Sequence, residues 1–230
     1  MHADGEQLKG RLKRLALSMG ASLFGVADLD AVRADTDLLD AAYNACTRGI
    51  SIGVRLDEAV LEDIVDGPTP EYCREYLRVN KTLNSIAEAV EREITSTGAH
   101  ALRIPASEVV DWEKLRGHVS HKLIGRYAGH GWIGKNILLV NADFGARVRY
   151  VTVLTDAELK PDSLVDGDCR KCARCVVVCP ANAAGDAPSE FDLQACFNKL
   201  AEFNDRFEEP HFICGMCIKA CKGKNERTRC

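Results

Sequence analysis

The stretch CRKCARCVVVCP, residues 169–180, decides the fold of the last quarter of this 230-residue chain. Its cysteines follow the spacing C-x2-C-x2-C-x3-C-P, which is the run found in bacterial ferredoxins with two clusters. Three thiolates in a tight loop can bind three irons of one cubane, while the fourth, displaced onto a following helical turn, binds the other cluster. The stretch therefore predicts 4Fe–4S clusters and electron transfer.

A second group of cysteines brings the predicted ligands to eight, the number that two cubanes need. It consists of the run C-x2-C-x3-C at residues 214–221 and of Cys196, which must reach in from a preceding helix. Cys230 is a spare candidate. If the crossed ferredoxin pattern holds, the ligands of one cluster are Cys169, Cys172, Cys175 and Cys221. The ligands of the other are Cys179, Cys196, Cys214 and Cys217.

Disulfides and zinc are the alternative explanations of these cysteines. Cysteines separated by only two residues suit metal ligation in a reducing compartment better than disulfides. Structural zinc sites usually come as two C-x2-C pairs, and three thiols at intervals of two residues before Cys-Pro depart from that pattern. The spacing therefore favours iron–sulfur clusters over zinc.

The composition is that of an ordinary globular protein, with 46% hydrophobic and 28% charged residues. Basic side chains interrupt the first 20 residues, which do not read as a signal peptide, and no apolar run reaches the ~20 residues that span a bilayer. We therefore expect a cytoplasmic protein without a membrane segment. The net charge of −4 gives no general attraction to phosphate backbones and argues against a nucleic-acid partner.

Helix and strand patterns alternate along the first two thirds of the chain. Residues 7–19 and 72–94 have apolar side chains at helical spacing, and residues 117–128 predict a shorter helix. Strands are predicted at residues 22–27, 49–56, 100–105, 137–140 and 147–155. We expect an α/β (α+β) domain over residues 1–160 and, after an acidic linker, a small second domain over residues 161–230.

The segment AGHGWIGKN, residues 128–136, has the composition of a cofactor site. Its glycines let the backbone approach a bulky ligand, and Lys135 and Asn136 offer hydrogen-bond donors beside it. A dinucleotide fingerprint runs from strand to turn to helix, whereas this turn is predicted to run from helix to strand, so that motif is excluded. An ordinary glycine-rich turn is the alternative.

Two distant motifs in a fixed order relate the chain to known families. The GWIGKN turn, the strand after it, the LTD at residues 154–156 and the split cysteine pattern resemble the epoxyqueuosine reductases and their relatives, the cobalamin-dependent reductive dehalogenases. Residues 66–80 and 118–122 resemble a shorter branch with the same double-cluster domain. The resemblance implies a nitroreductase-like α/β domain that binds cobalamin without its lower base, followed by a small ferredoxin-like two-cluster domain. Together with the composition of the turn, it gives as cofactor-binding candidates Gly129, His130, Gly131, Trp132, Gly134, Lys135 and Asn136.

The sequence departs from these families at three places. It ends soon after Cys221, without the helical-repeat extension that helps epoxyqueuosine reductases to grip tRNA, which together with the net charge predicts that tRNA is not a substrate. His130 replaces a leucine of the family and could bind cobalt from below. The segment LRGHVSHK, residues 115–122, has no acid where the family has its catalytic aspartate.

Another proton donor is therefore needed. A histidine titrates near neutrality and suits this role, as does a tyrosine at an open cobalt face. The candidates are His118, His121, Tyr72 and Tyr76. A place in the core is the alternative for both tyrosines, and a buried hydrogen-bonding role is the alternative for both histidines.

The sequence thus predicts a cobalamin-dependent reductase. Two 4Fe–4S clusters would pass electrons from a low-potential donor of the ferredoxin or flavodoxin type to a base-off corrinoid, which would reduce a small organic substrate. The alternative is an electron-transfer protein, or a reductive activator of a separate corrinoid protein, without cobalamin of its own. A flavin-binding reductase ranks last because no flavin-specific motif is present. The sequence predicts neither the identity of the substrate nor the oligomeric state.

Overall fold

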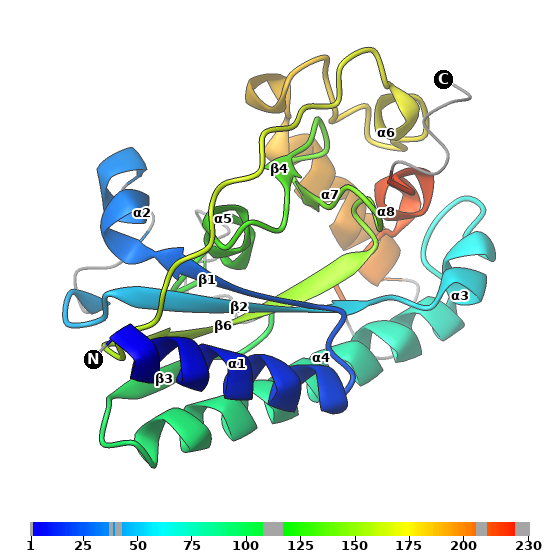
Figure 1. Cartoon of the computed structure of the whole chain (residues 1–230). Coiled ribbons are helices and arrows are strands. Elements are labelled where there is room, and N and C mark those ends of the chain that lie inside the picture. The colour runs from blue at the N-terminus through cyan, green and yellow to red at the C-terminus, as the bar shows by residue number, and fades with distance from the viewer. Residues whose placement is uncertain (1, 37–38, 40–42, 108–116, 206–210, 224–230) are drawn as a thin grey trace. The chain divides into compact units, whose positions relative to one another are not determined.

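The computed structural model describes residues 2–36, 39, 43–107, 117–205 and 211–223 (Figure 1). The chain divides into two compact units, each assembled from separate stretches. The first unit comprises Met1–Val54, Val79–His130 and Arg149–Val165. The second unit comprises Arg55–Arg78, Gly131–Val148 and Asp166–Cys230. The predicted mixed α/β fold is confirmed, whereas the predicted domain boundary at residue 160 stays a prediction.

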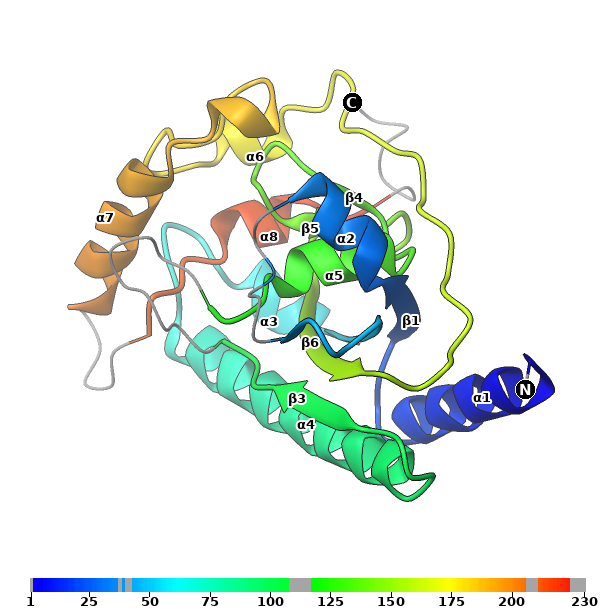
Figure 2. The ribbon, with the colours of Figure 1, turned by 90° about the vertical axis from the view of Figure 1, so that its left-hand side faces the viewer.

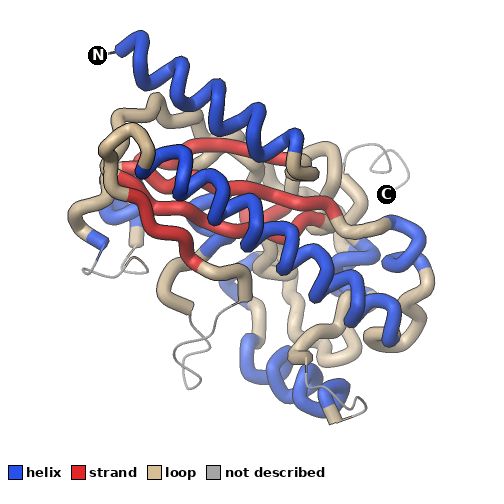
Figure 3. The backbone as a smooth tube through the Cα atoms, turned by 90° about the horizontal axis from the view of Figure 1, so that it is seen from below, coloured by secondary structure: helices blue, strands red, loops and turns tan. Residues whose placement is uncertain are grey.

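A four-stranded sheet forms the centre of the first unit (Figure 3). Its strands are β1 (Leu23–Asp28), β2 (Arg48–Arg55), β3 (Ala101–Ile104) and β6 (Val148–Thr155). They stand in the order β1-β2-β6-β3, and the pairs β1–β2 and β3–β6 are antiparallel. All four strands were predicted from the sequence, and their bounds agree with the prediction to within one residue.

Helices cover both faces of this sheet (Figures 1 and 2). On one face lie α1 (His2–Ser18) and residues 79–95 of α4 (Pro70–Thr95). On the other face lie α2 (Leu29–Asp35) and α5 (His121–Tyr127), which pack against each other and against β1. Among the helices that the structure describes, none has both the length and the apolar character needed to cross a membrane.

The apolar stripe of α4 supplies much of the core of the first unit. Its side chains recur at intervals of three and four residues, so that they share one face of the helix. The fully buried members of the stripe are Val79, Leu83, Ile86, Val90 and Ile94. The helix is followed by Gly98 in a left-handed conformation (φ +89°), which ends it as the sequence predicts.

The segment between α5 and β6 differs from its prediction. The helix begins only after Ser120, whose hydroxyl accepts a hydrogen bond from the amide of Leu123. The predicted strand at 137–140 is reduced to β5 (Leu139–Val140), because Ile137 has a positive φ of 52°. β5 pairs with β4 (Trp132–Ile133). The glycine-rich turn therefore leads from α5 into a short hairpin, so the predicted course from helix to turn to strand is confirmed, although the strand is shorter than predicted and the hairpin was not predicted.

Short helices and this hairpin make up the second unit. The helices are α3 (Glu58–Glu62), α6 (Arg174–Val177), the 3-10 helix Pro188–Glu190, α7 (Leu193–Asn204) and α8 (Met216–Ala220). α8 contacts both α3 and α6. One apolar cluster of the unit joins Trp132, Val140 and Ala146, and Cys169 and Cys221 pack against it. The hairpin and the cysteine segments therefore share a common core.

The stripe of α4 gives a test of the fold. We expect Leu83→Ala to lower the free energy of unfolding by about 2–5 kcal/mol, because the side chain is fully buried and its removal leaves a cavity. Leu77→Ala is the matched control, since Leu77 lies on the same helix but is 42% exposed, and a surface change costs about 0.5 kcal/mol or less. Urea unfolding of both variants measures the difference, and equal losses would contradict the packing.

Candidate functional site

All eight predicted cluster ligands lie in the second unit. Two of them, Cys169 and Cys172, lie in the loop before α6. Helical segments carry or border the others, namely Cys175, Cys179, Cys196, Cys214, Cys217 and Cys221. Cys196 lies on α7, as predicted for the ligand that must reach in from a helix. The two remaining described cysteines, Cys46 and Cys73, are buried outside this group.

The first set of interacting thiols centres on Cys175. Burial raises the pKa of the Cys175 thiol to about 11. The neighbouring groups that raise this pKa further are Cys221, Cys169 and Cys172. Repulsion between thiolates is strong only over short distances. These four sulfur atoms, from segments about 50 residues apart, are therefore neighbours in space.

The second set of interacting thiols centres on Cys214 and Cys217. Burial raises the pKa of Cys214 to about 11, and it also raises the pKa of Cys217. In both cases the neighbouring thiols of Cys196 and Cys179 contribute. Cys217 is also influenced by Cys175, which makes the two sets adjacent. The two sets have the membership that crossed ligation requires, and ligation itself stays a prediction.

The chemistry of this donor set fits iron–sulfur clusters. Thiols with raised pKa values stay protonated near neutral pH unless a positive charge stabilises their thiolates, and a metal centre supplies that charge. Among the residues that the structure describes, no three His, Cys, Asp or Glu side chains are placed to hold a single metal ion. That finding does not bear on a cubane, whose four thiolates bind four separate irons.

Two predicted proton donors, Tyr72 and Tyr76, lie beside the second set of cysteines. Gly215, between Cys214 and Cys217, has a φ of +84°, and a Cβ built on it would lie 2.9 Å from Cε1 of Tyr72. Tyr72 is fully buried, while the ring of Tyr76 lies 6.1 Å from that of His211. Within this unit Tyr72 therefore packs against the cysteine loop, whereas Tyr76 contacts His211 in the segment before that loop.

The glycine-rich turn approaches the first set of cysteines closely. A Cβ on Gly131 would lie 2.0 Å from the carbonyl oxygen of Val140, so only glycine fits there. A Cβ on Gly134 would lie 3.3 Å from Sγ of Cys169 and 2.7 Å from Cγ2 of Val140. The ring of Trp132 fills the space beside Gly167. The turn is therefore built against the cysteine loop.

Lys135 and Asn136, at the end of the turn, are both buried. Nζ of Lys135 lies 3.6 Å from Oδ1 of Asp186. Oδ1 of Asn136 accepts a hydrogen bond from the amide of Leu138, while its buried Nδ2 has no partner among the described residues. An unsatisfied buried donor is costly, and a polar group of a bound cofactor would satisfy it. Asn136 therefore fits the predicted role in cofactor binding.

The other two residues of the predicted turn, Gly129 and His130, belong to the first unit. Gly129 has a φ of +77°, and a Cβ on it would lie 2.7 Å from the carbonyl oxygen of Ser163. His130 is buried, its Nε2 lies 3.1 Å from the carbonyl oxygen of Ser51, and its ring stacks on Tyr150. Burial lowers the pKa of His130. Nε2 of His130 would have to give up its contact with the carbonyl oxygen of Ser51 before it could bind a metal.

A buried polar patch around His130 was not predicted. Tyr150 and Ser51 are buried, and their hydroxyl groups have no hydrogen-bond partner among the described residues. Burial raises the pKa of Tyr150, so its phenol stays protonated at physiological pH. In the sequence Tyr150 reads as one more residue of an alternating strand. Only the tertiary contact with His130 distinguishes it.

The two predicted histidine donors lie in the first unit. His118 is exposed and makes an edge-to-face contact with the ring of Tyr43. His121 Nδ1 lies 2.8 Å from the hydroxyl of Thr152, and its Nε2 lies 3.1 Å from the carbonyl oxygen of Pro105. Burial lowers the pKa of His121 to about 4. A neutral, doubly hydrogen-bonded ring is poorly suited to donate a proton. Residues 108–116, before this segment, lie outside the described residues.

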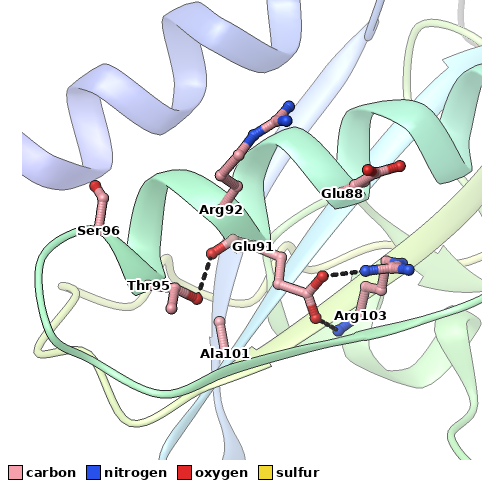
Figure 4. Close-up of a pocket in the computed structure, with 7 residues that line it drawn as sticks. All are labelled: Glu88, Glu91, Arg92, Thr95, Ser96, Ala101 and Arg103. Carbon is pink, nitrogen blue, oxygen red and sulfur yellow. Dashed lines mark hydrogen bonds and ion pairs between the residues drawn. The ribbon is translucent and has the colours of Figure 1, made fainter.

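A recess of about 580 Å³ on the first unit involves none of the predicted site residues (Figure 4). It lies between α4 and β3, where Glu91 binds both the amide and the guanidinium of Arg103. β3 is an edge strand, and this ion pair covers one of its amides. We therefore interpret the recess as the shielded edge of the sheet.

No family model matches the chain, but individual relatives do. The chain is similar to an epoxyqueuosine reductase of Leadbetterella byssophila, with 27% identity over 160 residues, which cover 65% of this chain and 49% of that protein. The chain thus spans about half the length of this curated relative.

Two solved structures have a similar fold. One is an epoxyqueuosine reductase solved with an epoxyqueuosine-modified stem loop of tRNA-Tyr. Its TM-score is 0.67 at 17% identity, and the alignment covers 96% of this chain and 66% of that one. The other is a reductive dehalogenase whose structure suggests a mechanism for B12-dependent dehalogenation, with a TM-score of 0.71 and 18% identity, covering 91% of this chain and 31% of that one.

The relatives of this chain are oxidoreductases. The particular resemblance predicted from the sequence, to epoxyqueuosine reductases and reductive dehalogenases, is confirmed.

The exclusion of tRNA made from the sequence is wrong. A structural neighbour that aligns with 96% of this chain holds a tRNA stem loop, and the curated relative has the same name. The net charge of −4 is a sum over the whole chain. It does not report the local charge of a surface that contacts phosphates, and so it cannot exclude an RNA partner.

His121 gives a test of the electrostatics in the first unit. The unfolded chain protonates this side chain near pH 6.5, whereas the fold keeps it neutral down to about pH 4. The unfolded state therefore binds more protons in this window, and the free energy of unfolding falls as the pH is lowered through it. Because His121 as a whole residue is partly exposed, we discount the effect for screening by solvent and expect a loss on the order of 1 kcal/mol.

The measurement is urea unfolding between pH 7 and pH 4. His121→Gln should remove this part of the pH dependence, because glutamine does not titrate. His100→Gln, at an exposed histidine of the same unit, should leave it unchanged. An unaltered pH dependence in His121→Gln would contradict the assignment.

Proposed function

We propose that this chain is a cobalamin-dependent iron–sulfur reductase, in which two 4Fe–4S clusters pass electrons to a base-off corrinoid. The observation that carries the proposal is the contact between the glycine-rich turn and Cys169, because it joins the predicted cofactor turn to the predicted cluster ligands within one unit. The second unit would be ferredoxin-like in its use of the eight cysteines, and the first would be nitroreductase-like.

Each part of the chain has a task in this proposal. The two sets of thiols hold the clusters, with Cys175 and Cys217 linking one set to the other. The hairpin β4–β5 presents the buried amide of Asn136 and the ammonium group of Lys135 to polar groups of the cofactor. When bound, the corrinoid would supply a redox-active metal that the side chains of the protein cannot provide.

A proton must accompany the electrons, and the chain offers several groups for it. Of the predicted donors, His118, Tyr72 and Tyr76 remain candidates, whereas the hydrogen bonds and lowered pKa of His121 argue against it. We add Tyr150, whose buried phenol keeps its proton at physiological pH and has no hydrogen-bond partner among the described residues.

The substrate and the electron donor follow from the relatives and from the chemistry. A small organic molecule is one substrate class, as the resemblance to reductive dehalogenases implies. Epoxyqueuosine in an RNA stem loop is the other, since a structural neighbour is solved with that ligand. The electrons would come from a low-potential ferredoxin or flavodoxin, because the clusters themselves only relay charge.

A second candidate is an electron-transfer protein that activates a separate corrinoid protein. The packing of the turn favours it, because the space beside Gly131 and Gly134 is filled by Val140 and Cys169 of the chain itself. Those glycines are then explained without a ligand. Binding of cobalamin by this chain separates the two candidates.

Anaerobic titration with cobalamin tests the proposal. We expect the protein with intact clusters to bind cobalamin and to shift its visible spectrum to the base-off form. Asn136→Ala should weaken binding by about tenfold, which corresponds to the ~1.4 kcal/mol of one hydrogen bond to a polar group. The control is Asn44→Ala, at an exposed asparagine. Cobalamin that stays base-on and elutes apart from the protein would refute the first candidate and leave the second.

A further inference from the structure

Arg147 is a buried cation in the second unit. Its side chain is 2% exposed, which makes it one of the largest fully buried side chains of the chain. Its guanidinium donates to Oε1 of Glu58 at 3.2 Å and to Oε1 of Glu62 at 2.8 Å. A buried charge is expensive unless it is paired in this way, so its retention in the interior calls for a reason.

The same guanidinium donates to the carbonyl oxygen of Lys219. Lys219 lies between Cys217 and Cys221, on α8. The residue before the arginine, Ala146, donates its amide to the carbonyl oxygen of Cys221 at 3.1 Å. Ala146 and Arg147, two consecutive residues, therefore both donate hydrogen bonds to the backbone of the Cys217–Cys221 segment.

Further hydrogen bonds join the Cys217–Cys221 segment to the end of α3 and to the residues that follow it. Nζ of Lys219 donates to the carbonyl oxygens of Glu62 and Ile64, at 2.8 and 2.7 Å. Nζ of Lys222 lies 2.9 Å from Oε1 of Glu62. Glu62 thus joins the arginine to the middle of the segment, at Lys219, and to Lys222 just after it, and the network restrains the backbone between the two cysteines.

The C-x3-C segment is the place where the two sets of thiols meet. In the crossed arrangement Cys217 belongs to one cluster and Cys221 to the other, so a charge fixed against this segment acts on both clusters. Reduction adds one electron to a cluster and makes it more negative, which a nearby cation favours. The carboxylates that offset Arg147 are 55% and 40% exposed and are screened by water, whereas the guanidinium is not.

We propose that Arg147 is a positioning residue that fixes the Cys217–Cys221 segment and raises the reduction potential of the clusters. The proposal rests on the iron–sulfur part of the proposed function and is independent of cobalamin. Nothing in the sequence around residue 147 marks the arginine, since the strand prediction includes it as an ordinary polar position. Only its burial and its bond to Lys219 reveal it.

The test is a redox titration of anaerobically purified protein without cobalamin, followed by electron paramagnetic resonance, with iron counted on the same samples. Arg147→Gln should make reduction of at least one cluster about tenfold less favourable, which is 59 mV for a one-electron couple. Arg147→Lys should recover most of the shift, because it keeps the charge. Arg55→Gln is the control, since it removes an exposed arginine that also binds Glu58. Arg55→Gln should change the equilibrium constant for reduction of the clusters by less than threefold.

A second variant decides the question if Arg147→Gln fails to assemble its clusters. Glu62→Gln removes a half-exposed carboxylate and leaves Arg147 less compensated, so it should make reduction more favourable. Full iron content with unchanged potentials in Arg147→Gln or in Glu62→Gln would overturn the proposal. A wild-type protein without iron would instead overturn the proposed function itself.

Discussion

The structure depends on one electrostatic constraint, which is the burial of several thiols beside one another in the second unit. Burial and repulsion from neighbouring thiols raise the pKa of Cys175 and of Cys214 to about 11, so within each set the thiols cannot ionise together unless a positive charge stabilises them. In the proposed function iron would supply such a charge and would convert an unfavourable arrangement into a stable centre. The short helices, the hairpin and the Arg147 network can then be understood as the support that brings distant sulfur atoms together.

The solved neighbours show that this chain has a known fold, but they do not determine its substrate. Both solved neighbours share the fold at 17–18% identity, and one is an epoxyqueuosine reductase with a tRNA stem loop while the other is a reductive dehalogenase. The same architecture therefore serves different substrates, and function must be argued from the site. In this chain the site is marked by the contact of the glycine-rich turn with Cys169.

Periodicity was enough to predict the strands of the sheet and the buried stripe of α4, because each leaves a regular pattern in the sequence. The assignment of the cysteines to two clusters stays a prediction. The hairpin β4–β5 was missed because the positive φ of Ile137 is a non-glycine exception that no pattern reveals. Arg147 and Tyr150 were missed because their importance lies in burial and in partners far away in the chain. The exclusion of tRNA failed because net charge is a global sum, whereas recognition is local.

Iron content measured with matched cysteine variants tests the central claim most directly. Anaerobically purified wild-type protein should contain about eight irons and eight sulfides per chain. Cys175→Ser and Cys217→Ser should each lose or alter one cluster, while Cys46→Ser, at a buried cysteine outside both sets, should keep the full content. A wild-type protein that binds zinc and has no visible absorbance would contradict the account. So would two serine variants with undiminished iron and an unaltered reduction signal.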